Sequence, residues 1–338
     1  MRNIPTKALG SAAAVLLSAA LSPAWAQVVC GDTITTKAIL AGDLDCATEP
    51  ALTIGDGGSL DMAGFTVACD GTGDGIVLGA TGAALSNGTV TGCSNAAVSL
   101  LVGGNTLNSV TARDSTTGFS AAAGGNKISN CSAIGNLDGF SISGDGNKLT
   151  QLAASGNTFS NIGVGGDGNS LSRLHSIGSL YGITLNGNGN KMRGSTAVGS
   201  GLDAISVSGD GNGLTGNTAS TNSGSGFVVL GTGDKLVKNT AAGNGGSGFV
   251  VIDNGHKIVK NHVSGCVATG INIAGHDSTV SGNNITGCDV GIAADGTGNR
   301  IKGNRAIGST TTDFSDAAVG CSNAWTKNIG RKSQPCIQ

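Results

Sequence analysis

Two histidines, an aspartate and an arginine are the side chains of this sequence best suited to chemistry. His256, His276, Asp277 and Arg300 all fall within residues 231–305. Imidazole and carboxylate groups exchange protons as general acids and bases, and a guanidinium group holds a carboxylate or phosphate. We therefore take these four residues as the candidate catalytic set. They can form a site only if the fold brings them together.

Lysine and arginine are concentrated in the same segment. Residues 231–305 hold 7 basic and 5 acidic residues, a net charge of 7 − 5 = +2, whereas residues 31–230 hold 7 basic and 14 acidic residues, a net charge of 7 − 14 = −7. A basic face attracts an acidic polymer, although a charged face also keeps a protein soluble without binding anything. The predicted ligand-binding residues are Lys235, Lys238, Lys257, Lys260, Arg300 and Lys302.

The sequence offers no motif for a metal ion or a cofactor. Its nine cysteines include no Cys-x-x-Cys pair and no Cys/His pair at the spacing of a zinc site. The recurring Gly-Asp-Gly-Asn phrases differ from calcium-binding nonapeptides, because they return about every 22 residues and lack the following Asp. We expect neither a metal nor a cofactor.

A repeat of about 22 residues positions all of these side chains. One apolar residue, the anchor, recurs at intervals that are mostly 21 or 22 residues: Leu60, Leu85, Leu107, Ile128, Leu149, Leu171, Met192, Leu214, Leu236, Ile258, Val280 and Ile301. A second column with the same period opens short alternating segments such as Phe140-Ser141-Ile142, which are typical of half-buried strands. Strands this short bury a face only when successive coils stack. The sequence therefore predicts an all-β, single-stranded parallel β-helix of about 12 coils.

The composition excludes a helical protein. Gly accounts for 60 of 338 residues, and Glu49 is the only glutamate among 21 acidic residues. Gly and Asp favour turns, whereas helices use Glu freely. No proline occurs between Pro50 and Pro335, as expected where every strand donates hydrogen bonds to its neighbours.

A column of asparagines accompanies the repeat in five successive coils. Three residues after the anchor come Asn217, Asn239, Asn261, Asn283 and Asn304, and earlier coils have Val110, Cys131, Leu152 and Leu174 at this position. The apolar residues of the earlier coils place the column inside the coil, where stacked amides can bond to one another. We interpret the column as a structural ladder and not as a binding site.

Eight of the nine cysteines are predicted to form disulfides, as is common in exported proteins. Cys266 and Cys288 each follow an anchor by eight residues, so stacking brings them within bridging distance. The full set of predicted pairs is Cys30–Cys46, Cys69–Cys93, Cys266–Cys288 and Cys321–Cys336. Cys131 falls in the inward column and is expected to be free and buried.

The opening of the chain resembles secreted bacterial proteins with a right-handed parallel β-helix of the pectate-lyase-like type, a class that binds and hydrolyses carbohydrates. The resemblance rests on Cys30-Gly31-Asp32, on Asp43-Leu44-Asp45-Cys46 and on Leu60-Asp61-Met62-Ala63-Gly64. In that class a Leu-Asp-Leu-x-Gly phrase commonly marks the first full coil. The resemblance implies the right hand of the coil, but it implies no single activity, because this fold carries lyases, hydrolases, epimerases and inert scaffolds.

Two short phrases are similar to parts of polygalacturonases. Gly275-His276-Asp277 and Arg300-Ile301-Lys302 resemble that family's Gly-His-Gly and Arg-Ile-Lys pieces. The family's Asn-Thr-Asp and paired-Asp motifs, which supply the general acid and base, are absent from the sequence. The sequence therefore contains no complete catalytic motif, and whether the protein is an enzyme stays open.

Residues 1–26 have the pattern of a signal peptide. Arg2 and Lys7 precede an apolar run, and Ala24-Trp25-Ala26 is a cleavage site. Cleavage leaves a net charge of 17 − 21 = −4, which disfavours binding to nucleic acid, and no later apolar run is long enough to span a membrane. The predicted order is a signal peptide at 1–26, an N-terminal cap at 27–57, a β-helix at 58–315 and a disulfide-closed tail at 316–338.

These observations together predict an exported β-helix scaffold or binding protein, secreted or periplasmic, with a monomer favoured. Its expected partner is an acidic polysaccharide or a cell-surface component. The alternative is a polysaccharide lyase or glycoside hydrolase that acts on an acidic glycan through the candidate catalytic set.

Overall fold

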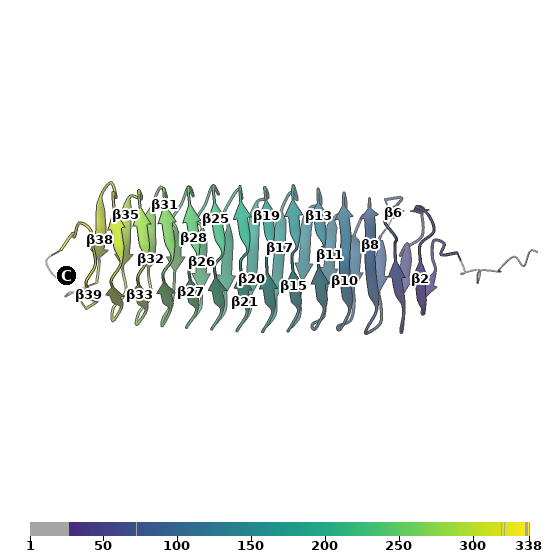
Figure 1. The fold of residues 1–338 in the computed structure, drawn as a ribbon, viewed down its shortest axis with the longest axis horizontal. Helices are drawn as coiled ribbons and strands as arrows, with labels where there is room; N and C mark the ends of the chain where they lie inside the picture. The colour runs from purple at the N-terminus through teal and green to yellow at the C-terminus, as the bar shows by residue number, and fades with distance from the viewer. Residues whose placement is uncertain (1–26, 72, 319, 321, 335–336, 338) are drawn as a thin grey trace, which may run out of the picture.

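The computed structural model describes residues 27–338 except 72, 319, 321, 335, 336 and 338. The regular elements in this part of the chain are 39 short β-strands, which wind into a straight rod of about 13 stacked turns (Figure 1). At roughly 4.8 Å per turn the rod is roughly 60 Å long. The prediction of an all-β parallel β-helix is confirmed, and its right hand stays a prediction.

Each turn contributes up to three strands, which form three parallel stacks along the rod. Stack A is one 14-stranded sheet: β1 (Thr33–Ile34), β4 (Leu52–Ile54), β7 (Ile76–Leu78), β9 (Ala96–Leu100), β11 (Thr117–Ala121), β14 (Asp138–Ile142), β17 (Ser160–Gly165), β20 (Tyr181–Asn186), β23 (Ile205–Ser208), β26 (Phe227–Leu230), β29 (Phe249–Val251), β32 (Thr269–Ile273), β35 (Val290–Ala294) and β38 (Thr312–Asp316).

Stack B contains the anchor residues: β2 (Lys37–Ile39), β5 (Ser59–Asp61), β8 (Ala84–Thr91), β10 (Thr106–Arg113), β12 (Lys127–Ser129), β15 (Lys148–Thr150), β18 (Ser170–Ser172), β21 (Lys191–Arg193), β24 (Gly213–Thr215), β27 (Lys235–Val237), β30 (Lys257–Val259), β33 (Thr279–Ser281), β36 (Arg300–Lys302) and β39 (Ala324–Thr326). Stack C shares the long strands β8 and β10 with stack B and also contains β3 (Leu44–Cys46), β6 (Thr66–Cys69), β13 (Ser132–Ile134), β16 (Ala153–Ser155), β19 (His175–Ile177), β22 (Thr196–Val198), β25 (Thr218–Ser220), β28 (Thr240–Ala242), β31 (His262–Ser264), β34 (Asn284–Thr286) and β37 (Arg305–Ile307).

The register of these stacks is the one that the repeat predicts. Leu149 pairs with Leu171, and Val280 pairs with Ile301. The small excess over 12 coils arises at both ends: residues 27–57 contribute β1 to β4 to the same stacks, and β39 pairs with β36 after the last anchor, Ile301. Residues about 22 apart in the sequence are therefore direct neighbours in space.

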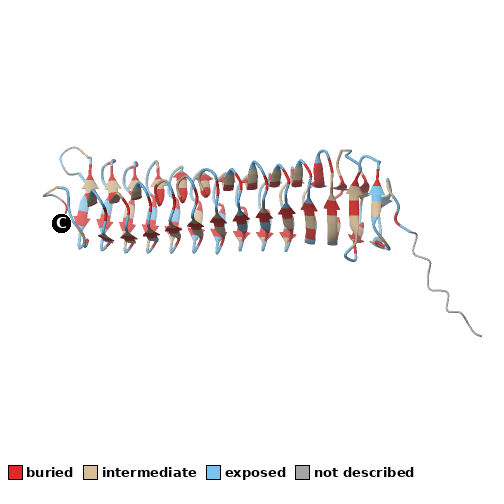
Figure 2. Cartoon of the chain, turned by 90° about the horizontal axis from the view of Figure 1, so that it is seen from above, coloured by how far each residue is buried: buried red, intermediate tan, exposed pale blue. Residues whose placement is uncertain are grey.

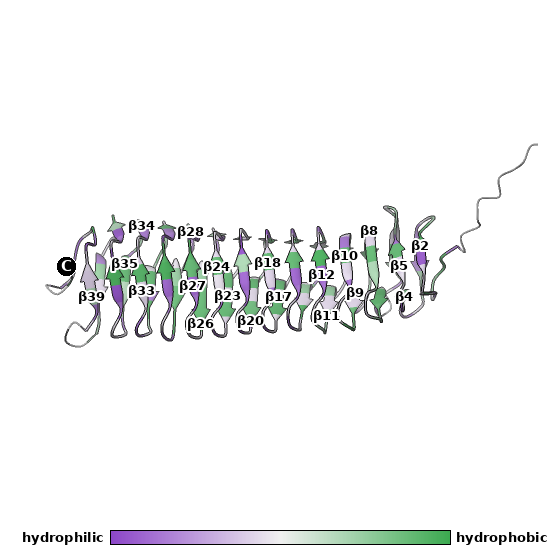
Figure 3. Ribbon diagram, turned by 60° about the horizontal axis from the view of Figure 1, so that its bottom comes forward, coloured by the Kyte–Doolittle hydropathy of each residue, from purple (hydrophilic) through white to green (hydrophobic). Residues whose placement is uncertain are grey.

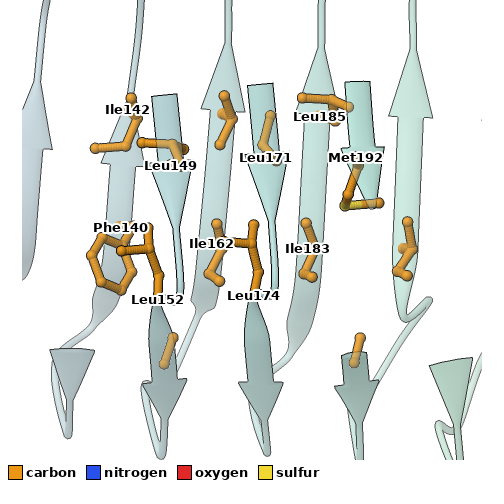
Figure 4. Packing of buried hydrophobic residues seen from close by; sticks show 14 of the residues in the cluster. Phe140, Ile142, Leu149, Leu152, Ile162, Leu171, Leu174, Ile183, Leu185 and Met192 are labelled. Atoms are coloured by element: carbon orange, nitrogen blue, oxygen red, sulfur yellow. The ribbon is translucent and has the colours of Figure 1, made fainter. Parts of the chain in front are cut away.

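The core is a continuous column of apolar side chains along the inside of the rod. Buried positions follow the strands, while the exposed ones follow the turns (Figure 2). In the close-up, Phe140, Ile162 and Ile183 from stack A face Leu152 and Leu174 from the turns between stacks B and C (Figure 4). Phe119 and Phe140 stack with their ring centroids 4.6 Å apart. Apolar and polar residues alternate along the short strands (Figure 3). Each strand is too short to bury its apolar residues alone, so each turn needs its neighbours.

Buried polar ladders line the corners between the stacks. The predicted asparagine column lies at the corner between stacks B and C, and Asn239 donates its backbone N–H to Oδ1 of Asn261 at 2.8 Å. Asn261 repeats the same bond to Asn283 at 2.8 Å, which confirms the ladder. A second ladder, not predicted, occupies the corner between stacks A and B: Asn105, Asn126, Asn147, Asn169, Asn190 and Asn212.

Three of the four predicted disulfides are present: Cys30–Cys46, Cys69–Cys93 and Cys266–Cys288. The fourth pair, Cys321–Cys336, and the signal peptide at 1–26 lie outside the described residues. Cys131 is free and buried, as predicted. Burial raises the pKa of its thiol to about 12, so Cys131 stays protonated and unreactive at neutral pH.

Candidate functional site

The outer side of stack B carries a row of cations, which we call the basic face. It consists of strands β12, β15, β18, β21, β24, β27, β30, β33 and β36 with the turn residue that follows each strand. Its cations are Lys127, Lys148, Arg173, Lys191, Arg193, Lys235, Lys238, Lys257, Lys260, Arg300 and Lys302. The nine strands contain no acidic residue. The face therefore includes all six predicted ligand-binding residues and extends the row to Lys127.

The pairing of the strands fixes the spacing of these cations. Lys127 pairs with Lys148, and Lys235 pairs with Lys257, so each pair is one turn apart. Neighbouring strands of a sheet lie ~4.8 Å apart. The strand β24 separates Lys191 from Lys235 and carries no cation. The strand β33 and the turn residue Gly282 also carry no cation, so the result is a positive row along the rod with gaps at β24 and β33.

The cations of the face have no carboxylate partners within the part of the chain that the structure describes, where the ion pairs involve only Arg113, His256 and Arg331. Asp145, Asp167 and Asp210 lie in the turns beside the early part of the row, and their carboxylates bond to backbone groups. Oδ1 of Asp145 accepts the backbone N–H of Asp167 at 2.7 Å, and Oδ1 of Asp210 accepts that of Thr232 at 2.7 Å. These aspartates tie successive turns together.

Two shallow hollows lie in the first half of the basic face. One, of about 300 Å³, is lined by Thr106, Lys127, Ile128, Ser129, Lys148 and Thr150. The other, of about 360 Å³, is lined by Lys148, Thr150, Ser172, Arg173, Arg193 and Gly194. Since they share Lys148 and Thr150, they adjoin along the rod. The second hollow exists because Gly194 has no side chain to fill it, and the long side chains of Lys148, Arg173 and Arg193 surround it.

Three cations of the face occupy a backbone conformation that favours glycine. Arg173, Lys238 and Lys260 follow their strands with φ of 55°, 56° and 57°. The same turn position is glycine in other coils, including Gly216 with φ of 65°. A side chain in the left-handed region costs roughly 1 kcal/mol. The fold therefore carries cations where glycine would be more stable, and strain of this kind is concentrated at functional sites.

Replacing these cations by glycine should separate stability from binding. We expect Lys238→Gly with Lys260→Gly to raise the free energy of unfolding by about 1 kcal/mol, after the greater freedom of glycine in the unfolded chain is subtracted. The same variant should bind acidic polymers more weakly. Urea unfolding and titration with a soluble polyanion measure the two effects.

The matched reverse variant is Gly216→Lys, which adds a cation to the gap at β24. A Cβ atom there meets nothing within 4 Å, so only the backbone conformation opposes the change. We expect this variant to lose about 1 kcal/mol of stability and to gain affinity for the polymer. Equal binding by both variants and the natural protein would contradict a role for the turn cations.

The structure does not assemble the candidate catalytic set. His256 is fully buried, and its Nε2 lies 2.8 Å from the carbonyl oxygen of Ile252. It cannot contact a substrate at the surface, so its assignment to a catalytic set is wrong. His276 is exposed, and its Nδ1 lies 2.9 Å from Oγ1 of Thr297. Within the described residues, no hydrogen bond or ion pair joins any two of His276, Asp277 and Arg300.

The side chain of His256 is buried because it belongs to the ladder between stacks A and B. Asp234 and His256 continue the column of asparagines after Asn212, and Oδ1 of Asp234 accepts the backbone N–H of Asn212 at 2.6 Å. Nδ1 of His256 and Oδ2 of Asp234 are 3.5 Å apart, both fully buried and without a hydrogen bond. Burial raises the pKa of Asp234 to about 6 and lowers that of His256. The pair is a costly part of the core and not a surface site.

A known family matches the half of the chain that contains most of this face. The sequence model described as periplasmic copper-binding protein (NosD) matches residues 152–333 of the 338. The chain belongs to the NosD family. No curated protein matches the sequence. The family description and the three disulfides agree with export from the cytoplasm.

Several solved structures are similar to this NosD-family chain at low sequence identity. The A-module of the mannuronan C-5 epimerase AlgE6 of Azotobacter vinelandii is 14% identical over 89% of this chain and 90% of its own, with a TM-score of 0.34. A mannuronic-acid-specific family 6 polysaccharide lyase from human gut microbiota is 10% identical over 85% and 78%, with a TM-score of 0.48. The periplasmic alginate epimerase AlgG, as a single-substitution variant, is 11% identical over 87% and 78%, with a TM-score of 0.47.

The copper in the family description does not fit the residues of this chain. Soft thiolate and thioether groups and imidazoles are the ligands that copper prefers. Met62 and Met192 are buried among apolar side chains, and Cys131 is buried alone. The described residues contain no group of three or more His, Cys, Asp or Glu side chains that could hold a metal ion. The same part of the chain contains no helix long and apolar enough to cross a membrane.

Proposed function

We propose that this NosD-family protein is an exported binding protein for an acidic polysaccharide, which lies along the basic face parallel to the rod. The observation that carries the proposal is the row of eleven cations, which seven of nine successive strands and the turn residues after them contribute without an acidic residue among them. Periplasm is the compartment that the family description favours. The six residues from Lys235 to Lys302 that the sequence predicts as ligands are part of the proposed site.

The geometry suits a linear polymer better than a small molecule. One turn of the rod advances by ~4.8 Å, which is close to the length of one pyranose ring in an extended chain. Successive uronate carboxylates can therefore meet cations on successive or alternate turns. The hydroxyl groups of Thr150 and Ser172 line the second hollow beside Lys148, Arg173 and Arg193, where they can bond sugar hydroxyls.

Binding without catalysis is supported by the chemistry of the face. Proton abstraction or glycosidic cleavage needs an acid and a base in contact with the same sugar. The strands of the face supply cations and hydroxyl groups only, and His256 is buried in the core. Because these strands contain no carboxylate and no imidazole, the arrangement favours holding a uronate over transforming it.

Removing three cations around a hollow tests the proposal. We expect Lys148→Ala with Arg173→Ala and Arg193→Ala to weaken binding of polygalacturonate or alginate about tenfold, since an exposed ion pair contributes about 0.5 kcal/mol. A triple variant at Lys235, Lys257 and Arg300 should lose a similar amount. Binding should also weaken steeply as salt is added.

The matched control removes the same charge away from the face, by alanine at Lys37, Arg113 and Lys332. Binding by this control should equal that of the natural protein. The proposal fails if all three triple variants bind alike, or if neutral glucans bind as tightly as the uronates. Release of unsaturated products or new reducing ends from either uronate would instead show an enzyme.

A further inference from the structure

The N-terminal end of the rod presents unpaired strand edges around a hollow. Strand β1 pairs only with β4, and β2 pairs only with β5, so the outer edges of both strands lack a neighbour within the described residues. A hollow of about 340 Å³ lies along these edges and is lined by Val28 and by residues 32–39. Ile39, which lines the hollow, is 47% exposed, and Val29, next to the lining residue Val28, is 49% exposed. Such an edge is a template for another strand.

This first turn is also acidic. Residues 28–51 contain four acidic side chains, Asp32, Asp43, Asp45 and Glu49, against one base, Lys37, a net charge of 1 − 4 = −3. Asp43, Asp45 and Glu49 are exposed. An occupant of this end must therefore offer parallel strand edges, apolar contact and positive charge.

The opposite end of the same rod has these properties. Among the described residues, its outer strand β39 pairs only with β36, and Ile329 and Lys332 form bridges to Arg305 and Phe314. Ile329 is 63% exposed. Residues 322–334 contain Lys327, Arg331 and Lys332 and no acidic residue, a net charge of +3. The two ends are complementary in charge and alike in strand direction.

We infer that a second copy of this chain docks its C-terminal end on the N-terminal end of the first. The contact continues the parallel pairing that already joins successive turns within one rod. The two contacting surfaces differ, so every assembly keeps one free N-terminal end and one free C-terminal end. The contact therefore forms open chains of rods and not closed dimers. Association of this kind weakens with salt, because opposite charges drive it.

Charge reversal at the two ends tests the inference with the exported protein. Asp45→Lys with Glu49→Lys makes both ends positive, and Lys327→Glu with Lys332→Glu makes both negative. None of these four side chains has an ion pair with another described residue. At low salt we expect the natural protein to rise in weight-average mass with concentration in sedimentation equilibrium. Each variant alone should stay at the mass of one chain.

The decisive measurement is sedimentation equilibrium of an equimolar mixture of the two variants. The mixture should associate again, because the positive N-terminal end of one variant fits the negative C-terminal end of the other, and this recovery also shows that both variants are folded. The inference is overturned if the natural protein stays at the mass of one chain at every concentration. It is equally overturned if either variant alone associates as the natural protein does, or if the mixture does not associate.

Discussion

Replacement of Asn261 by leucine should lower the free energy of unfolding by about 4 kcal/mol. The Oδ1 atom of Asn261 accepts hydrogen bonds from the backbone N–H and the Nδ2 of Asn239, and its own Nδ2 donates to the carbonyl of Leu236 and to Oδ1 of Asn283. A buried polar group left without its partner costs about 1 to 3 kcal/mol. Leucine restores some apolar burial but none of these four bonds. The midpoint of urea unfolding measures the loss.

The matched control is Asn272→Leu on the outer side of stack A. Asn272 is half-buried, and its Oδ1 has no hydrogen-bond partner. The same change of side chain should therefore leave the stability of the protein nearly unchanged. Leucine itself is tolerated in the ladder column, since Leu152 and Leu174 occupy it in earlier turns. If Asn261→Leu were as stable as the natural protein, the ladder would not hold the turns together.

The double substitution Asp234→Asn with His256→Asn should raise the free energy of unfolding by roughly 3 kcal/mol at pH 7. The neutral ring of His256 donates from Nε2 to Ile252, so its Nδ1 is an acceptor that faces the unpaired Oδ2 of Asp234. An ionised Asp234 with a pKa near 6 instead of 3.8 opposes folding by about 3 kcal/mol above pH 6. In other turns an asparagine amide fills this place and donates, as Nδ2 of Asn212 does to the carbonyl of Gly209. Urea unfolding of the double variant measures the gain.

The two single variants should depend on pH in opposite directions. With His256→Asn, the raised pKa of Asp234 remains, so the folded state binds more protons and stability falls as the pH rises from about 4 to about 6. With Asp234→Asn, the lowered pKa of His256 remains, so the unfolded state binds more protons and stability falls as the pH drops below 6.5. Identical pH profiles for both variants would show that this buried pair does not titrate with folding.

The fold was predictable because the same residue types recur at a fixed spacing in the sequence. The anchors, the column from Asn217 to Asn304 and the pair Cys266–Cys288 all recur at 21 to 22 residues, and stacking converts that period directly into contact. No helix or long loop intervenes to break the register in the described part of the chain.

The errors about the site have a physical reason as well. His256 is a candidate by its imidazole group alone, yet it stands two residues before the anchor Ile258, as Asn147 stands before Leu149. That column is inward in every turn from Asn105 on. The hollows near Lys148 could not be predicted, because they depend on how long side chains lie around small ones such as Gly194.

Protection of individual lysines from acetylation tests the central claim most directly. The folded, exported protein is treated briefly with an acetylating reagent in the presence and absence of alginate or polygalacturonate, and each lysine is read by mass spectrometry. We predict protection of Lys127, Lys148, Lys191, Lys235, Lys257 and Lys302, while Lys37 and Lys332, at the ends of the rod, react at unchanged rates. Unchanged reactivity along stack B, or equal protection of Lys37 and Lys332, would contradict a polymer lying on the basic face.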